Sequence, residues 1–228
     1  YTSIALDSSG KAYISYYDIT NGAIGDLKYA TNASGDTTPP SVSLNAVTSP
    51  TSVTSQTITG TVESGATVSV ATSTAASDGS ATVSGTTWSY TITGLVEGAN
   101  GITVTATDTA GNTATASGSI TLDTTAPTVS STSPASGAVG VSASSVITAA
   151  FSEAMNSSTI TTSTFTVNNG TDNISGAVSY SDTTATFTPS ASLSSYTTYT
   201  ATITTGVTDA TGNAMAANAT WSFTTADT

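Results

Sequence analysis

The chain has 228 residues, a formal net charge of −12 and only 7 % charged residues. It contains no Cys, Arg or His, and its two basic residues are Lys11 and Lys28. Residues 37–228 therefore carry no cation, so salt bridges cannot hold that part of the fold together. Such an acidic surface repels nucleic acid and anionic lipid, and the lack of Cys excludes disulfides and thiolate metal sites.

The sequence predicts an all-β protein without a membrane-inserted segment. No apolar run reaches the roughly 18 residues that a membrane-spanning helix needs. Ser, Thr, Ala and Gly dominate, and a Thr-rich chain poor in Lys, Glu and Leu favours strands with one exposed face over helices. The chain begins with Tyr1 and shows no signal peptide, which fits a mature or truncated chain.

Residues 1–35 differ from the rest of the chain. Residues 3–18 predict two strands joined by a tight turn, and residues 26–31 predict a third. The stretch is similar to one repeat of a β-propeller-like module, although a blade normally has four strands and an isolated sheet this small is marginal. We expect its aromatic cluster to need a partner surface, formed by Tyr13, Tyr16, Tyr17 and Tyr29.

Residues 36–125 predict a first β-sandwich domain. Apolar residues alternate with Ser or Thr, as in a strand with one face buried, within residues 56–62, 67–70, 88–92 and 102–106. Turn-forming residues separate these runs, at residues 63–65, 77–79, 97–101 and 110–112. Many short strands with regular turns are typical of a sandwich.

Residues 126–228 predict a second sandwich with different details. Strands are expected at residues 146–151, 164–167, 184–187, 199–203 and 221–223, with one helical turn within 153–160. We expect the large aromatics of these strands to form its core, as Trp88 does in the first domain: Phe151, Phe187, Tyr199, Trp221 and Phe223.

An Asp-Thr pair recurs at the predicted domain boundaries. It occurs at Asp36, Asp123 and Asp227, which are 87 and 104 residues apart, the length of one small sandwich domain. A polar turn containing Gly-Asn lies before the end of each intervening segment, at residues 108–112 and 209–213. We therefore interpret the chain as part of a series of similar domains, or as a processed unit of one.

The motifs of both segments resemble bacterial immunoglobulin-like (Ig-like) families. Residues 37–125 look like the tandem repeats of large bacterial adhesins, on Thr-Thr-Trp-Ser-Tyr at 86–90, Gly-Leu-Val-Glu-Gly-Ala-Asn at 94–100 and Asp-Thr-Ala-Gly-Asn at 108–112. Residues 126–228 resemble the S-layer-type Ig-like domain, on Phe-Ser-Glu-Ala-Met at 151–155, Asp-Ala-Thr-Gly-Asn at 209–213 and Trp-Ser-Phe-Thr-Thr at 221–225. The resemblance implies two Ig-like sandwiches in series and is weak for function.

Catalysis has little support in the sequence. Without His or Cys, the usual general bases and thiol nucleophiles are missing. A Ser–Lys pair could use only Lys11 or Lys28, and paired carboxylates would have to come from scattered turns. We expect a protein that is not an enzyme.

Two sets of carboxylates are candidate Ca²⁺ ligands. In an Ig-like sandwich, the loops after the second strand and between the last two strands lie at the end where the first strand begins. This topology brings Asp36, Glu63 and Asp108 together in the first domain, and Asp123, Glu153 and Asp209 in the second. Carboxylate and carbonyl oxygens suit Ca²⁺, and the resemblance supports ions at Ig–Ig junctions. The alternative is that each Asp is a solvated turn former.

Together these observations predict a non-catalytic structural protein of a bacterial cell surface, as a stalk or a segment of a self-assembling fibre. Its expected partners are other copies of itself or flanking domains of a longer chain. In the fibre interpretation, residues 1–35 pack against another copy, because exposed sheet edges accept an added strand. Two alternatives stay open: an adhesive module that binds carbohydrate or a surface, and an accessory region of a secreted hydrolase.

Overall fold

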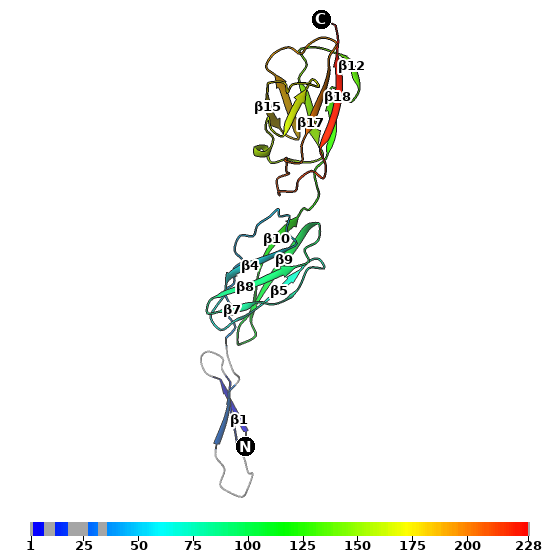
Figure 1. Cartoon of the computed structure of the whole chain (residues 1–228). Helices are drawn as coiled ribbons and strands as arrows, with labels where there is room; N and C mark the ends of the chain where they lie inside the picture. The colour runs from blue at the N-terminus through cyan, green and yellow to red at the C-terminus, as the bar shows by residue number, and fades with distance from the viewer. Residues whose placement is uncertain (1, 7–11, 18–26, 32–35, 228) are drawn as a thin grey trace. The chain divides into compact units, whose positions relative to one another are not determined.

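The computed structural model describes residues 2–6, 12–17, 27–31 and 36–227 (Figure 1). Strands dominate it, and the helix in these ranges is a single turn of 3-10 helix, Ser157–Thr159. The prediction of an all-β fold is confirmed. The chain divides into two compact units, residues 1–49 with 53–122, and residues 50–52 with 123–228.

The N-terminal region contributes three strands, β1 (Thr2–Leu6), β2 (Ala12–Tyr17) and β3 (Leu27–Thr31). They pair antiparallel in the order β1-β2-β3, and they fall on the three strands that the sequence predicts. The predicted turns between them lie outside the described residues, and the predicted contacts of their tyrosine side chains lie outside what the structure describes. The propeller-like repeat stays a prediction.

The first domain has two sheets. One has the order β4 (Ser55–Thr61), β8 (Thr87–Thr93), β7 (Thr82–Ser84). The other has the order β10 (Thr113–Leu122), β9 (Gly98–Thr107), β5 (Thr67–Thr72), β6 (Gly79–Ser80). Buried apolar side chains alternate with exposed Ser and Thr along β4 and β5, so each sheet buries one face and presents hydroxyls on the other.

Trp88 anchors the core of the first domain, as predicted. It is buried among Ile58, Ile92 and other apolar side chains, and its indole Nε1 donates to the carbonyl of Ser43 at 3.0 Å. Gly60 makes this contact possible, because a Cβ there would lie 2.0 Å from the Ser43 oxygen and 2.7 Å from Nε1. The strand therefore requires glycine at this position for packing rather than for a turn.

The predicted turn at residues 97–101 is wrong in part, because β9 begins at Gly98. Residues 98–101 pair with residues 119–122 of β10. Asn100 is fully buried there, and its Nδ2 donates to three carbonyls, those of Val96 (2.8 Å), Gly98 (3.0 Å) and Ile120 (3.3 Å). Pairing with β10 and these hydrogen bonds outweigh the local preference of Gly and Asn for turns.

The second domain has two four-stranded sheets. One has the order β11 (Val129–Ser133), β13 (Ile147–Phe151), β16 (Thr184–Pro189), β15 (Gly176–Ser181). The other has the order β12 (Ala138–Val141), β18 (Ala219–Thr225), β17 (Thr198–Ile203), β14 (Phe165–Asn168). β12 pairs parallel with β18, whereas the other pairs in these sheets are antiparallel.

Aromatic side chains fill the second core. The five predicted core aromatics are all at most 5 % exposed: Phe151, Phe187, Tyr199, Trp221 and Phe223. Phe165 adds a ring that packs at 5.8 Å from Phe187 and 5.9 Å from Trp221, between ring centroids. The predicted helical turn is present as the 3-10 helix after Asn156, whose side chain accepts from the Ser158 amide.

Each sandwich has two ends that matter for function. The "entrance end" is where the chain enters and where the turn before the last strand lies, at residues 108–112 and 209–213. The "exit end" is where the last strand finishes, at Leu122 of β10 and Thr225 of β18.

Candidate metal centre

The turn at the entrance end of the second domain is built around Asp209. The amide of Asp209 donates to the carbonyl of Asn213 at 2.9 Å, which closes the loop. Gly212 takes a positive φ of 97°, a conformation that strains other residues. The Asp-x-x-Gly-Asn pattern thus folds locally into a turn whose first and last side chains meet.

Asp209 is 1 % exposed as a residue, and its carboxylate accepts hydrogen bonds from four donor groups. Its Oδ1 accepts from the Thr211 amide (2.8 Å), the Thr211 hydroxyl (2.9 Å) and the Asn213 amide (2.8 Å). Its Oδ2 accepts from Asn213 Nδ2 at 2.8 Å. Oδ1 is therefore saturated, whereas Oδ2 keeps capacity for a further ligand.

Burial and hydrogen bonding act on the pKa of Asp209 in opposite directions. Burial raises it, but the hydrogen bonds from Asn213 and Thr211 outweigh burial and hold the pKa below its ordinary value. Asp108, in the equivalent turn of the first domain, also has a lowered pKa, chiefly because of the hydrogen bond from the Asn112 side chain. Both turns therefore favour the charged carboxylate.

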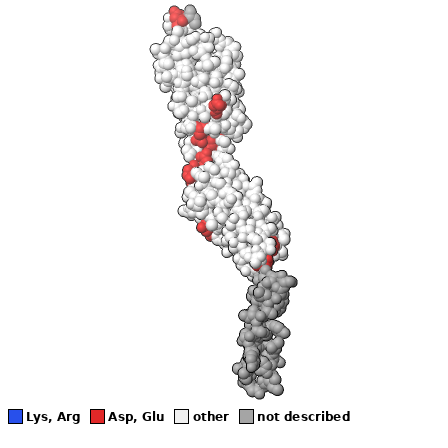
Figure 2. Space-filling view, turned by 180° about the vertical axis from the view of Figure 1, so that it is seen from behind, with Lys and Arg blue, Asp and Glu red and all other residues white. Residues whose placement is uncertain are grey.

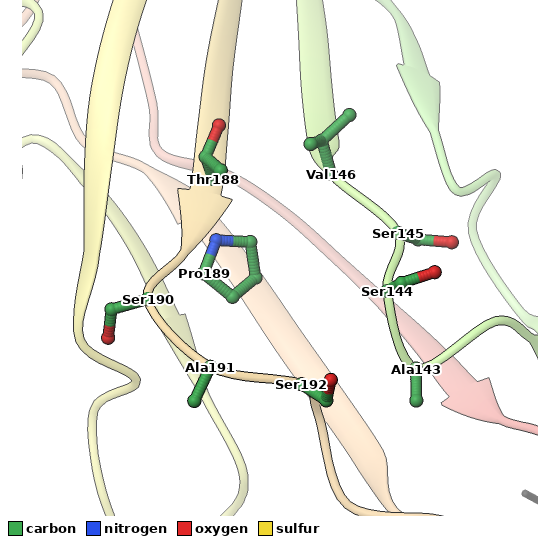
Figure 3. Close-up of a pocket in the computed structure, with 9 residues that line it drawn as sticks. All are labelled: Ala143, Ser144, Ser145, Val146, Thr188, Pro189, Ser190, Ala191 and Ser192. Carbon is green, nitrogen blue, oxygen red and sulfur yellow. The ribbon is translucent and has the colours of Figure 1, made fainter.

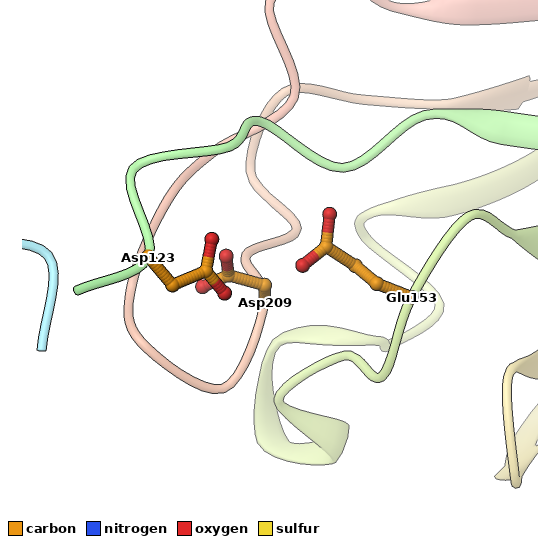
Figure 4. Close-up of side chains that lie close together, drawn as sticks. All are labelled: Asp123, Glu153 and Asp209. Atoms are coloured by element: carbon orange, nitrogen blue, oxygen red, sulfur yellow. The ribbon is translucent and has the colours of Figure 1, made fainter. Parts of the chain in front are cut away.

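Asp123 and Glu153 join Asp209 in what we term the acidic cluster (Figure 4). One carboxylate oxygen of each residue lies within 4.8 Å of those of the other two. The three come from separate segments: Asp123 precedes β11, Glu153 follows β13, and Asp209 lies between β17 and β18. Asp123 and Glu153 are half-buried, so the cluster is reached from solvent.

The electrostatics of the acidic cluster favour a cation. No Lys, Arg or His occurs in the chain after Lys28, and the face shown in Figure 2 is largely uncharged, with the carboxylates gathered in a few places. Three carboxylates this close repel one another in a partly desolvated site. Hard oxygen ligands at this spacing suit Ca²⁺, with Asp209 offering Oδ2 and the other two residues offering accessible carboxylates.

The structure does not bring together the carboxylates of Asp36, Glu63 and Asp108, the candidate ligands of the first domain. Within the ranges that the structure describes, the acidic cluster is the one group of three acidic side chains with this spacing. Glu63 is exposed, and Asp108 turns its oxygens to its own loop, accepting from Ala110 and Asn112 amides at 2.8 and 2.9 Å and from Asn112 Nδ2 at 2.8 Å. Asp36 instead accepts from the Thr38 amide at 2.9 Å.

The two turns share a feature that the sequence reading missed. In the first domain, Asn112 Nδ2 also donates to the backbone carbonyl of Asp36 at 3.1 Å. In the second, Asn213 Nδ2 donates to the carbonyl of Asp123 at 2.9 Å. The turn Asn therefore ties the entering Asp to the domain in both cases. The sequence does contain a signal for this role, because each Asp-Thr pair at the start of a domain is followed later by Gly-Asn. The sequence analysis considered only the carboxylates of these motifs and not the Asn side chains.

Comparisons with known proteins match each of the two domains to a protein family. Two family models match, both described as bacterial Ig-like domain, at residues 42–124 and 123–225. The matches begin at residue 42, so they do not bear on the propeller-like fragment. Among the curated proteins, none matches the chain.

Solved structures with similar folds come from varied sources. The Escherichia coli adhesin FdeC has 13 % identity and a TM-score of 0.48, covering 93 % of this chain and 73 % of its own. Chicken CNTN1 FN1–FN3 domains have 13 % identity and a TM-score of 0.30, covering 95 % and 78 %. The Drosophila receptor phosphatase DLAR Ig1-2 module has 9 % identity and a TM-score of 0.28, covering 84 % and 100 %. At these values the likeness carries no functional argument.

In the described part of the chain, no helix has the length and apolarity needed to cross a membrane. The two family matches overlap at residues 123 and 124 and fall on the two observed sandwiches. The chain therefore contains two bacterial Ig-like domains in tandem, at residues 42–124 and 123–225.

Proposed function

We propose that the chain is a non-catalytic spacer segment of a bacterial surface or extracellular protein, and that Ca²⁺ bound by the acidic cluster stabilises its second domain. The presence of two bacterial Ig-like domains supports a surface or adhesin-type role. The candidate site is at the entrance end, where a bound ion acts on the connection between domains rather than on a substrate.

One observation carries the proposal: Asp123 serves both the linker and the site. It follows Leu122, the last residue of β10, without an intervening residue. Its carbonyl accepts from Asn213 Nδ2 at 2.9 Å and from the Thr211 hydroxyl at 3.4 Å, while its carboxylate belongs to the acidic cluster. A cation held there would fix the residue through which the second domain is joined to the first.

The chemistry of the cluster favours binding over catalysis. Asp209 is held in its charged form by four donors, so it is a poor proton donor near neutral pH. The chain has no His or Cys to act as base or nucleophile beside it. The three carboxylates are therefore suited to holding a cation.

Removal of Ca²⁺ from the full chain tests the proposal. Binding to the folded state alone stabilises it by about 2.7 kcal/mol at a hundredfold excess of Ca²⁺ over Kd. We expect chelation to lower the melting temperature of the second domain by roughly 10 °C. We also expect it to change the small-angle scattering profile, because the angle between the two domains becomes less restricted. A chelator that changes neither quantity would overturn the calcium part of the proposal.

An adhesive role is separated from the spacer role by binding measurements. A glycan array and immobilised surface proteins are probed with the full chain, with and without Ca²⁺. The spacer proposal predicts no specific binding at micromolar concentration, whereas specific binding would contradict it. A catalytic domain in the flanking reading frame would instead favour an accessory region of a secreted hydrolase.

Self-assembly through residues 1–35 belongs to the same proposal as its fibre form. β1, β2 and β3 form a sheet of only three strands, which is small for independent stability. We propose that this sheet packs against an Ig-like domain of another copy and that the contact repeats without closing. Deletion of residues 1–35 should then abolish oligomers seen by electron microscopy, and an intact chain that is monomeric at high micromolar concentration would contradict the fibre form.

A further inference from the structure

The exposed apolar side chains of the two domains gather at one end of each sandwich. Five large apolar residues from residue 36 onward are notably exposed. In the first domain they are Val53 and Val96, 60 % and 39 % exposed, which lie just before β4 and β9. Both positions are at the exit end, since the start of β9 pairs with Leu122.

The exit end of the second domain has the same construction with more apolar surface. Val139, Tyr196 and Val146 are 80 %, 72 % and 45 % exposed. They lie in β12, before β17 and before β13, and β12 pairs with the final residues of β18. Isolated exposed apolar residues are ordinary, but a set confined to one end of a domain marks a contact surface.

Equivalent hydrogen bonds hold the exit loops in both domains. Buried Leu95 donates its amide to the carbonyl of Thr54 at 3.0 Å, and buried Leu193 donates to the carbonyl of Ala143 at 2.9 Å. In the second domain, the loops of residues 143–146 and 188–192 border a groove of about 260 Å³ (Figure 3). In the first domain, the exit end leads directly into Asp123 and a second Ig-like domain.

Asp227 repeats the sequence position of Asp36 and Asp123. It comes two residues after the end of β18, whereas Asp123 directly follows β10, and in each case Thr comes next. The carbonyls of Asp36 and Asp123 are each taken by the turn Asn of the domain that they enter. Tyr196 positions Asp227, because its hydroxyl donates to the Asp227 carboxylate and its amide donates to the carbonyl of Ala226 at 3.3 Å.

We propose that the exit end of the second domain docks the entrance end of a further bacterial Ig-like domain, whose Asp-x-x-Gly-Asn turn donates from its Asn to the backbone carbonyl of Asp227. This inference rests on the spacer role proposed above and names its partner. A second copy of this chain is disfavoured as the occupant, because its Asn112 and Asn213 are already engaged by its own Asp36 and Asp123.

A fusion protein tests the proposal. A duplicate of residues 125–228 is joined after Thr228 of the full chain, so that Asp227-Thr228 takes the place of Asp123-Thr124. We expect amide hydrogen exchange at Val139 and Tyr196 to slow about tenfold relative to the unfused chain, because contact with the added domain makes local opening of the exit end less favourable. The control inserts a flexible Gly-Ser linker after Thr228, which retains the added domain but uncouples it and should restore the faster exchange.

A variant and a concentration series complete the test. Asn213→Ala in the duplicate alone should remove the protection, and circular dichroism checks that the duplicate stays folded. If Asn213→Ala unfolds the duplicate, Asn213→Ser in the duplicate is used in its place. Equal exchange in the fused and unfused chains would overturn the proposal. Protection that appears in the unfused chain as its concentration rises would overturn it in favour of self-association.

The outcome is distinguishable from failure of the proposed function. The fusion is measured in Ca²⁺ and in chelator. Protection in both conditions would support the docking surface even if the chelation experiment shows no effect of Ca²⁺ on stability. A clear Ca²⁺ effect on stability with no protection in the fusion would leave the calcium site standing and refute the docking surface.

Discussion

The side chain of Asn213 holds two residues of the candidate metal centre in place. Its Nδ2 donates to the carbonyl of Asp123, to Oδ2 of Asp209 and to the Thr211 hydroxyl at 2.9, 2.8 and 2.8 Å. It therefore positions two of the three members of the acidic cluster. An amide is suited to this role because it donates to both acidic residues without neutralising the charge that a cation would need.

Replacement of Asn213 tests this positioning role. Asn213→Ala removes the one hydrogen-bond donor to Oδ2 of Asp209 and the shorter of two hydrogen bonds to the Asp123 carbonyl. We therefore expect the free energy of unfolding of the second domain to fall by about 1–3 kcal/mol. Chemical denaturation in the presence of chelator measures this without a contribution from Ca²⁺. Asn218→Ala is the control, since Asn218 accepts one hydrogen bond, from the Thr205 amide. Equal losses in the two variants would contradict the role of Asn213.

The lowered pKa of Asp108 predicts how the stability of the first domain depends on pH. The Asn112 hydrogen bond lowers the pKa of Asp108 in the folded state below its ordinary value of 3.8. Its contribution to stability is therefore fully present above pH 3.8 and is lost as pH falls through the lower folded-state pKa. We expect Asp108→Asn to melt below wild type at pH 7, with a difference that shrinks below pH 4. A difference that grows on acidification would show the sign to be wrong.

At the scale of elements, the strands were predictable because their chemistry is periodic. Alternation of apolar residues with Ser or Thr located β4, β5 and β8, and Trp88 was assigned to the core because it lies in such a strand. The start of β9 was not predictable, because Gly98 and Asn100 resemble turn residues and only their pairing with β10 shows otherwise. Long-range pairing of this kind leaves no local signal.

The candidate site was predictable from topology in the second domain and not in the first. The carboxylates of Asp123, Glu153 and Asp209 converge because loop order in a sandwich fixes which segments meet. The orientation of Asp108 toward its own turn depends on side-chain hydrogen bonds, which loop order does not specify. The second role of Asn112 and Asn213 toward the entering Asp was missed for the same reason.

Gly60 provides a test of packing within β4. Gly60→Ala would place a methyl group against the Ser43 carbonyl and the Trp88 indole, neither of which can move without disturbing the core. We expect a loss of about 3 kcal/mol in the free energy of unfolding of the first domain. The control is Thr59→Ala on the exposed face of the same strand, with a loss below about 1 kcal/mol. Thermal and denaturant melts measure both, and a Gly60→Ala loss no larger than the control would refute the packing argument.

At the scale of the whole molecule, the chain combines interiors that are ordinary with a surface that is unusual. Both cores consist of buried apolar side chains, whereas residues 37–228 are rich in hydroxyl side chains and free of cations. With no basic partner available in these domains, their carboxylates must rely on backbone donors, amide side chains or bound cations. The acidic cluster at the entrance end of the second domain is where this constraint is greatest.

Calorimetric titration of Ca²⁺ into the full chain and into Glu153→Gln tests the central claim most directly. Glu153→Gln removes one charge from the acidic cluster, and Glu63→Gln is the matched control outside it. We predict one binding site, with a Kd in the range of about 10⁻⁴–10⁻³ M typical of extracellular modules, weakened at least about tenfold by Glu153→Gln and unchanged by Glu63→Gln. The absence of binding to the wild-type chain, or equal affinity in all three proteins, would contradict the account.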